Sequence, residues 1–340
     1  MAGGGTYTDM TASLPTAVGP LSDRVCSALS RDVGRTTPLA LGDLGDLGDQ
    51  HRSVFDHDAQ LALYILNELH YSGWAGVDDG WEWTPKVAQW REHLASWFER
   101  SVRAEVASNL ADPAIEVTRL LGLDGPSVSR HLAAEGTIDQ LVESMILRTP
   151  YHGKEADPHT FVIPRLNGPV KRTLCDIQAG EYGVGHARSH AELFADALTD
   201  LGIDPTPNAH IDLCTGPSLA TSNLVSLGAL RRRLRGVVLG QLSLFEMDSV
   251  VPNGRMVECA ERLGCSARVR WFFQVHVLAD AEHEVQAQQA FLVDYPQQEP
   301  AQVDNLLLGM RAQSLIDHRL AADLMDEWTR RSTPAAVGGR

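Results

Sequence analysis

Apolar residues recur along most of this chain at the three- and four-residue spacing of an amphipathic helix. The pattern begins near residue 54, where Leu61, Tyr64, Ile65 and Leu69 share one face and Gly73 supplies a stop. Strict alternation of apolar and polar residues, the signature of a half-buried strand, is rare. The pattern therefore predicts an all-α protein.

The same periodicity predicts a long series of helices, separated by glycine and proline signals. One helix follows residue 54 and a second follows Pro85. The later helices are expected at residues 115–123, 127–134, 138–147, 158–181, 189–201, 218–233, 237–250, 256–263, 267–292 and 300–330. Neither GxGxxG nor GxxxxGK[ST] occurs, so nucleotide-binding folds have little support.

The chain divides into three regions by composition and pattern. Residues 1–50 are rich in Gly, Thr, Ser, Pro and Asp and end in the repeat LGDLGDLGD, which is typical of a flexible or loosely packed N-terminal arm. Residues 51–150 form an N-terminal helical region without a motif of its own, expected to complete the bundle and to offer a homodimer contact. Residues 151–330 form the core that carries the chemistry.

Charge and cysteine usage narrow the class of protein. The formal net charge of −15 argues against nucleic acid as a partner, and the basic run at residues 231–235 is interpreted as a solvated helix face. Five scattered cysteines without a CxxC suit a reducing cytoplasm. No signal peptide is recognisable, and no stretch approaches the roughly 20 apolar residues of a membrane helix. We expect a cytoplasmic protein without a membrane partner.

The most informative stretch is the predicted helix that contains His276, Asp280 and His283. These residues lie at positions i, i+4 and i+7, so all three project from one helix face. Two imidazoles and a carboxylate in this arrangement suit a borderline metal such as iron or zinc. A surface ladder of ion pairs is the alternative.

Two further sets of residues favour a metal. Glu246 is a single acid inside an apolar run, where a carboxylate usually has a cation or a metal as its partner; a buried salt bridge is the alternative. Glu181 and His190 flank a segment in which Gly183 permits a bend and a serine can cap a new helix, so the two side chains are expected to face each other. His186 is a competing ligand in a loop.

Together these sets give three histidines and three carboxylates on separate helices. A catalytic zinc typically takes three protein ligands and a water, so this is too many. Two irons bridged by a carboxylate would use them all. The ferritin-like alternative expects Glu-x-x-His twice, and this chain has none.

Four motifs in order resemble the haem-oxygenase-like di-iron oxidases and oxygenases, whose members are often named iron-containing redox enzymes. The similarity covers about residues 151–295 and is weaker around Glu68 and His70, which we interpret as packing residues. The motifs are KEADPHT at 154–160, EYGVG at 181–185 with HAELF at 190–194, SLFEM at 243–247, and the His276, Asp280, His283 triplet.

The resemblance implies a haem-oxygenase-like helical bundle with additional N-terminal helices, which binds two irons and no haem. By position, Glu181, His190 and His283 would bind one iron, His276 and Asp280 the other, and Glu246 would bridge them. Glu155 falls where some members have an extra carboxylate ligand, and bracing of the following helix is its alternative role.

The resemblance also implies the chemistry, because two ferrous ions can give O2 two electrons. We expect N-oxygenation of an amino acid or related amine in specialised metabolism, with an external electron donor as a further partner. Desaturation or oxidative C–C cleavage of an amino acid or fatty acid is the alternative within the family. A metal-free helical binding protein, in which the His and Glu residues form a polar core network, is the alternative outside it.

Overall fold

The computed structural model describes residues 11–33, 44 and 52–332, apart from the side chains of residues 280–282. Within these ranges the secondary structure is helical, with one isolated bridge between Ser13 and Ala75. The predicted all-α class is therefore confirmed. Among the described residues, no helix combines the length and the apolar character needed to cross a membrane.

The α-helices follow one another with short connections. They are α1 (Pro20–Leu29), α2 (His57–Glu68), α3 (Pro85–Glu105), α4 (Pro113–Leu121), α5 (Val128–Ala134), α6 (Ile138–His152), α7 (Ala156–Thr160), α8 (Gly168–Glu181), α9 (His190–Asp200), α10 (Gly216–Ala229), α11 (Arg235–Met247), α12 (Val250–Arg262), α13 (Ala267–Ala287), α14 (Tyr295–Gln298) and α15 (Val303–Ser332). A π-helical segment at Gln288–Asp294 continues α13, and short 3-10 turns lie in several of the connections.

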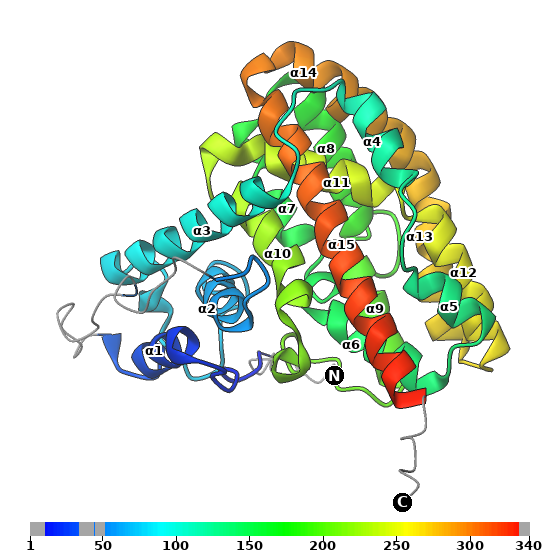
Figure 1. Ribbon diagram of the computed structural model, residues 1–340, viewed down its shortest axis with the longest axis horizontal. Coiled ribbons are helices and arrows are strands. Elements are labelled where there is room, and N and C mark those ends of the chain that lie inside the picture. Colours follow the sequence, from blue (N-terminus) through cyan, green and yellow to red (C-terminus); the bar gives the residue numbers. More distant parts are fainter. Residues whose placement is uncertain (1–10, 34–43, 45–51, 333–340) are drawn as a thin grey trace, which may run out of the picture.

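Helix α15 forms the centre of the structure. It packs along α11 and also contacts α10, α4 and α5. Figure 1 shows α15 in orange and red across the middle of the molecule, with α12 and α13 on one side and α1, α2 and α3 forming a lobe on the other. Three clusters of buried apolar side chains fill the spaces between these helices.

Glycines allow α11 and α15 to approach unusually closely. A Cβ atom at Gly240 would lie 1.9 Å from the backbone oxygen of Leu306, and one at Gly309 would lie 2.1 Å from that of Val237. Because no side chain fits in this space, the two backbones touch. This contact fixes the position of α11, whose last turn carries Glu246.

The N-terminal helices are attached to the bundle through buried polar groups. Asp58 accepts hydrogen bonds from the backbone nitrogens of Leu21 (2.9 Å) and Ser22 (2.8 Å) at the start of α1. Val25 and Leu29 of α1 are fully buried. Residues 20–29 are therefore a packed helix inside the segment predicted as a flexible arm, while residues 1–10, 34–43 and 45–50 of that segment lie outside the described residues.

One predicted helix was wrong in its extent. Residues 158–181 form two helices, α7 and α8, with a short 3-10 turn between them. The break has a local cause, because Gly168 adopts a φ of +58° and Pro169 begins the new helix. The remaining predicted helices are present, with ends that differ by a few residues.

Candidate metal centre

Seven Glu and His side chains from five α-helices and one inter-helix turn gather in the middle of the bundle. They are His152 at the end of α6, Glu155 just before α7, Glu181 at the end of α8, His190 at the start of α9, Glu246 in α11, and His276 and His283 in α13. They form three groups, and within each group the ligand atoms lie within 4.8 Å of one another. Glu155 and Glu181 each belong to two groups, so the seven side chains make one continuous cluster.

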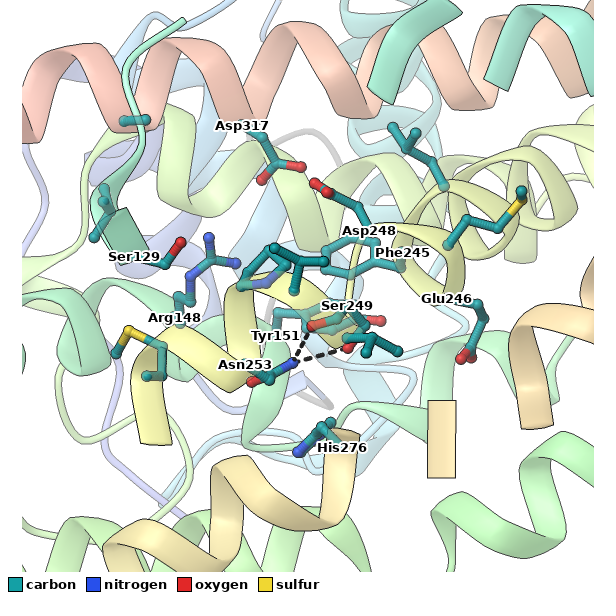
Figure 2. Close-up of a pocket in the computed structure, with 18 of the residues that line it drawn as sticks. Ser129, Arg148, Tyr151, Phe245, Glu246, Asp248, Ser249, Asn253, His276 and Asp317 are labelled. Carbon is teal, nitrogen blue, oxygen red and sulfur yellow. Dashed lines mark hydrogen bonds between the residues drawn. The ribbon is translucent and has the colours of Figure 1, made fainter. Parts of the chain in front are cut away.

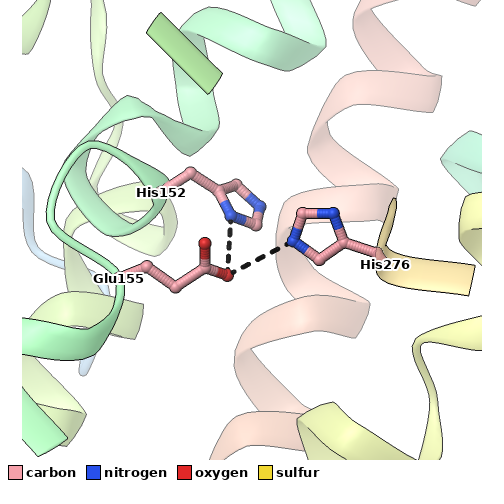
Figure 3. A group of neighbouring side chains, drawn as sticks. All are labelled: His152, Glu155 and His276. Atoms are coloured by element: carbon pink, nitrogen blue, oxygen red, sulfur yellow. Dashed lines mark hydrogen bonds and ion pairs between the residues drawn. The ribbon is translucent and has the colours of Figure 1, made fainter. Parts of the chain in front are cut away.

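The first group contains His152, Glu155 and His276 (Figure 3). The Nδ1 atom of His152 lies 3.1 Å from Oε1 of Glu155, and Nε2 of His276 lies 3.8 Å from the same oxygen. His276 donates its Nδ1 hydrogen to the backbone oxygen of Phe272 at 2.7 Å. In the neutral ring this leaves the Nε2 lone pair facing Glu155, as in a metal-ligating histidine.

His152 was not among the residues selected from the sequence. It stands three positions before Glu155, which is the reverse of the Glu-x-x-His order expected in ferritin-like sites. The motif His-x-x-Glu was the available signal. A helix end and a turn lie between the two residues, so helical spacing alone did not place them side by side.

The second group brings Glu181 and His190 together across the break between α8 and α9. Their Oε2 and Nδ1 atoms are 2.8 Å apart. Gly183 makes the turn with a φ of +74°, and a Cβ there would lie 2.4 Å from the backbone oxygen of Arg188. Ser189 then caps α9, accepting a hydrogen bond from the backbone nitrogen of Glu192 in a capping box. The predicted bend and cap are both present.

The third group contains Glu181, Glu246 and His283. Nδ1 of His283 lies 3.5 Å from Oε1 of Glu181 and 3.5 Å from Oε2 of Glu246. Helix α8 can come this close to α13 because Gly180 has no side chain. A Cβ at that position would lie 3.1 Å from Nε2 of His283.

Other residues singled out from the sequence lie elsewhere. Asp280 belongs to α13, but its side chain lies outside the described residues, so its ligand role stays a prediction. Glu68 forms a buried ion pair with Lys154, and His70 pairs with Glu82 at 2.7 Å. Glu68 and His70 therefore each pair with a side chain outside the cluster and belong to none of the three groups of ligand atoms.

The charges of the cluster fit a metal cation. Among the described residues, the only basic groups within 4 Å of Glu155 and Glu181 are imidazoles. Glu155 is 9% exposed, and its Oε2 atom has no hydrogen-bond partner. A buried carboxylate oxygen without a donor is costly unless a cation binds it. Carboxylates and imidazoles together are a donor set that suits iron, so this arrangement fits iron binding.

The pKa shifts are consistent with this interpretation. Burial lowers the pKa of His152, which keeps its ring neutral and able to ligate a metal. Burial raises the pKa of Glu155, but the neighbouring His152 and His276 outweigh this and hold it well below its usual value. Burial alone would lower the pKa of His190, but the hydrogen bond and the negative charge of Glu181 together raise it above its usual value.

A cavity of about 740 Å³ opens directly onto the cluster. His152, Glu155, Glu181, Glu246 and His276 all line it. Figure 2 shows Glu246 at the right of this cavity and His276 below it. Its size falls in the range of small-molecule sites, roughly 300–1,000 Å³.

Apolar and charged side chains share the walls of this cavity. The ring of Tyr151 stacks on that of Phe245, with centroids 4.8 Å apart. Asp248 and Asp317 lie farther from the cluster. Burial, and then the charge of Asp317, raises the pKa of Asp248 to about 6.

Comparison with known proteins supports the same assignment. The sequence model of the family described as iron-containing redox enzymes matches residues 143–318. Two crystal structures of a CADD-like protein of unknown function from Nostoc punctiforme share the fold. One is 16% identical with a TM-score of 0.50, covering 66% of this chain and 97% of that chain. The other is 19% identical with a TM-score of 0.51, covering 63% and 96%. No curated protein sequence matches significantly.

Proposed function

Because the chain belongs to the family of iron-containing redox enzymes, we propose that it binds two iron ions in the Glu and His cluster and uses O2 to oxidise a small molecule. The observation that carries this proposal is that Glu155 and Glu181 each belong to two of the three groups of ligand atoms. One metal ion at a catalytic site needs about three protein ligands. Seven buried or half-buried ligands joined through shared carboxylates suit a pair of ions.

The three groups suggest how the ligands divide. His152, Glu155 and His276 would hold one ion, and Glu181, Glu246 and His283 the other, with His190 beside Glu181. Asp280 remains a predicted ligand, and Glu246 remains the predicted bridge. When bound, two ferrous ions would supply two electrons to O2.

The protein's own residues prepare the site for this chemistry. The rings of Phe194 and Phe272 pack on the imidazoles of His152 and His276, at centroid distances of 5.3 Å and 4.8 Å, and shield one side of each from water. Burial raises the pKa of Tyr151 well above its usual value, so its phenol keeps its proton beside the cluster. These groups orient the ligands and keep the reacting end of the cavity dry.

The reaction that we propose is N-oxygenation of an amino acid or related amine. One oxygen atom of O2 joins the nitrogen, and the other leaves as water with two electrons and two protons. An external electron donor must therefore restore the enzyme after each turnover. Desaturation and oxidative C–C cleavage are the alternatives that the same cluster allows.

Product analysis under isotopically labelled dioxygen distinguishes these reactions. The iron-loaded protein is incubated with a reductant and a panel of amino acids and amines, and the products are identified by mass spectrometry. We expect a product that has gained one labelled oxygen atom on nitrogen. Loss of two hydrogen atoms would indicate a desaturase, and a shortened fragment would indicate a lyase.

His283→Ala should abolish the product while the far-ultraviolet circular dichroism stays unchanged. Glu258→Gln, an exposed acid on α12, is the matched control and should retain activity. If His283→Ala is as active as the control, the cluster is not the reaction site. If the wild type forms no product and takes up no iron, a metal-free binding protein becomes the better interpretation.

A further inference from the structure

The end of the cavity away from the cluster carries three charged side chains, two from helices and one from the residue after a helix. Arg148 comes from α6, Asp248 follows α11, and Asp317 comes from α15. Figure 2 shows the carboxylates of Asp248 and Asp317 pointing toward each other, with the Arg148 guanidinium nearby and His276 at the opposite side. The three residues are far apart in the sequence, so only the fold brings them to one place.

The positive charges of Arg148 and His318 act on both aspartates, and that of Arg255 acts on Asp248. Among the described residues, neither Arg148, Asp248 nor Asp317 forms an ion pair within 4 Å, and Asp317 accepts one hydrogen bond, from the Gln313 amide at 3.0 Å. Asp248 is exposed and lines the cavity.

Two facing carboxylates repel each other unless a cation lies between them. A guanidinium in a partly enclosed site likewise favours a carboxylate or phosphate partner. The cavity thus offers a place for a positive group and, beside it, a place for a negative one. Between this end and the cluster, the stacked rings of Tyr151 and Phe245 provide an apolar wall.

We propose that Arg148, Asp248 and Asp317 bind a zwitterionic substrate, with its ammonium group between the two aspartates and its carboxylate on Arg148. This inference rests on the proposed function, because it assigns the recognition end of the same cavity. The substrate class is an amino acid whose remaining chain extends past Tyr151 toward the cluster and carries a second nitrogen, the one that would be oxygenated.

The same charges discriminate against simpler molecules. A plain carboxylic acid would add a third negative charge near the two aspartates and place no cation between them. A plain amine would leave Arg148 without an anion. Each of these analogues loses one set of charge-assisted hydrogen bonds, so we expect each to bind at least about tenfold more weakly than the amino acid.

Binding can be measured without iron, which separates this inference from the proposed function. The metal-free protein is titrated calorimetrically with each of the twenty proteinogenic amino acids. The tightest one is then compared with its decarboxylated amine and its deaminated acid. The same titrations are run on Asp248→Asn, Asp317→Asn and Arg148→Met, with the exposed Arg172→Met on α8 as the matched control.

The expected result is a specific pattern of losses. The two aspartate variants should bind the amino acid about tenfold to a hundredfold more weakly and lose the preference for it over the deaminated acid. Arg148→Met should lose the preference for the amino acid over the amine, and the control should bind as the wild type does. Circular dichroism establishes that each variant is folded.

Two results would overturn the inference. One is that no amino acid binds the wild type, and the other is that the three variants bind as tightly as the Arg172→Met control. Iron titration of the same preparations reports on the proposed function separately. Iron uptake with unchanged amino acid binding in the variants rejects this inference alone, whereas a wild type that takes up no iron rejects the proposed function.

Discussion

The ion pair between Lys154 and Glu68 should be one of the largest single polar contributions to the stability of this fold. The side chains are 7% and 1% exposed. The Lys154 ammonium also donates to the hydroxyl of Tyr64 at 3.2 Å and lies 4.4 Å and 4.9 Å from the ring centroids of Tyr64 and Tyr71. This contact joins α2 to the turn that carries Glu155.

Lys154→Met tests this contribution with little change of volume. The substitution leaves the Glu68 carboxylate buried without its cation, which costs about 3–5 kcal/mol. It also removes two cation–π contacts, each worth about 0.5–2 kcal/mol. We expect the free energy of unfolding, measured by urea denaturation and far-ultraviolet circular dichroism, to fall by at least about 3 kcal/mol.

A double-mutant cycle makes the test specific. Lys154→Met together with Glu68→Gln removes both charges, so it should cost less than the sum of the two single changes by about 2 kcal/mol or more. Lys86→Met, at a partly exposed lysine that donates to Gln89, is the control and should change stability by less than about 0.5 kcal/mol. A cost below about 1 kcal/mol for Lys154→Met, or strict additivity in the cycle, would refute the reasoning.

Two further predictions concern the helices around α15. Gly240→Ala should destabilise the protein by about 2 kcal/mol or more in urea denaturation, because its Cβ would lie 1.9 Å from the Leu306 backbone oxygen. The control, Gly254→Ala, has open space around its Cβ and should be neutral or stabilising by up to about 1 kcal/mol. Equal effects of the two substitutions would contradict the close approach of α11 and α15. Hydrogen bonds from Arg119, and one from Arg311, hold the pKa of Glu116 at about 2 instead of 4.5. This carboxylate therefore contributes up to about 3 kcal/mol of stability, which is present above pH 4.5 and lost as the pH falls toward 2. Glu116→Gln should flatten this part of the stability profile, and an unchanged acid slope would show that Glu116 is not depressed.

Much of the helical architecture could be predicted because it depends on local signals. Apolar spacing and Gly or Pro stops located nearly every helix, including the bend between Glu181 and His190. The two failures arose from local geometry and from long-range contacts. The left-handed backbone at Gly168 splits the helix predicted at 158–181, and Asp58 ties α1 to α2 across 37 residues of sequence.

The candidate site was only partly predictable for the same reason. Glu181, His190, Glu246, His276 and His283 stand out in the sequence because each is polar within a helical or apolar context, and the structure gathers all of them. His152 lies at a helix end, where periodicity carries no information about its direction. The charged end of the cavity joins side chains of α6, α11 and α15, and no sequence spacing relates them.

The central claim is that the cluster binds two iron ions, and anaerobic titration of the metal-free protein with Fe(II) tests it most directly. We predict uptake of about two ions per chain in the wild type and clearly reduced uptake in Glu181→Ala, whose carboxylate belongs to two of the three groups. The exposed Glu258→Gln variant should match the wild type. A wild type that takes up no iron, or a Glu181→Ala variant that takes up as much as the wild type, would contradict the account.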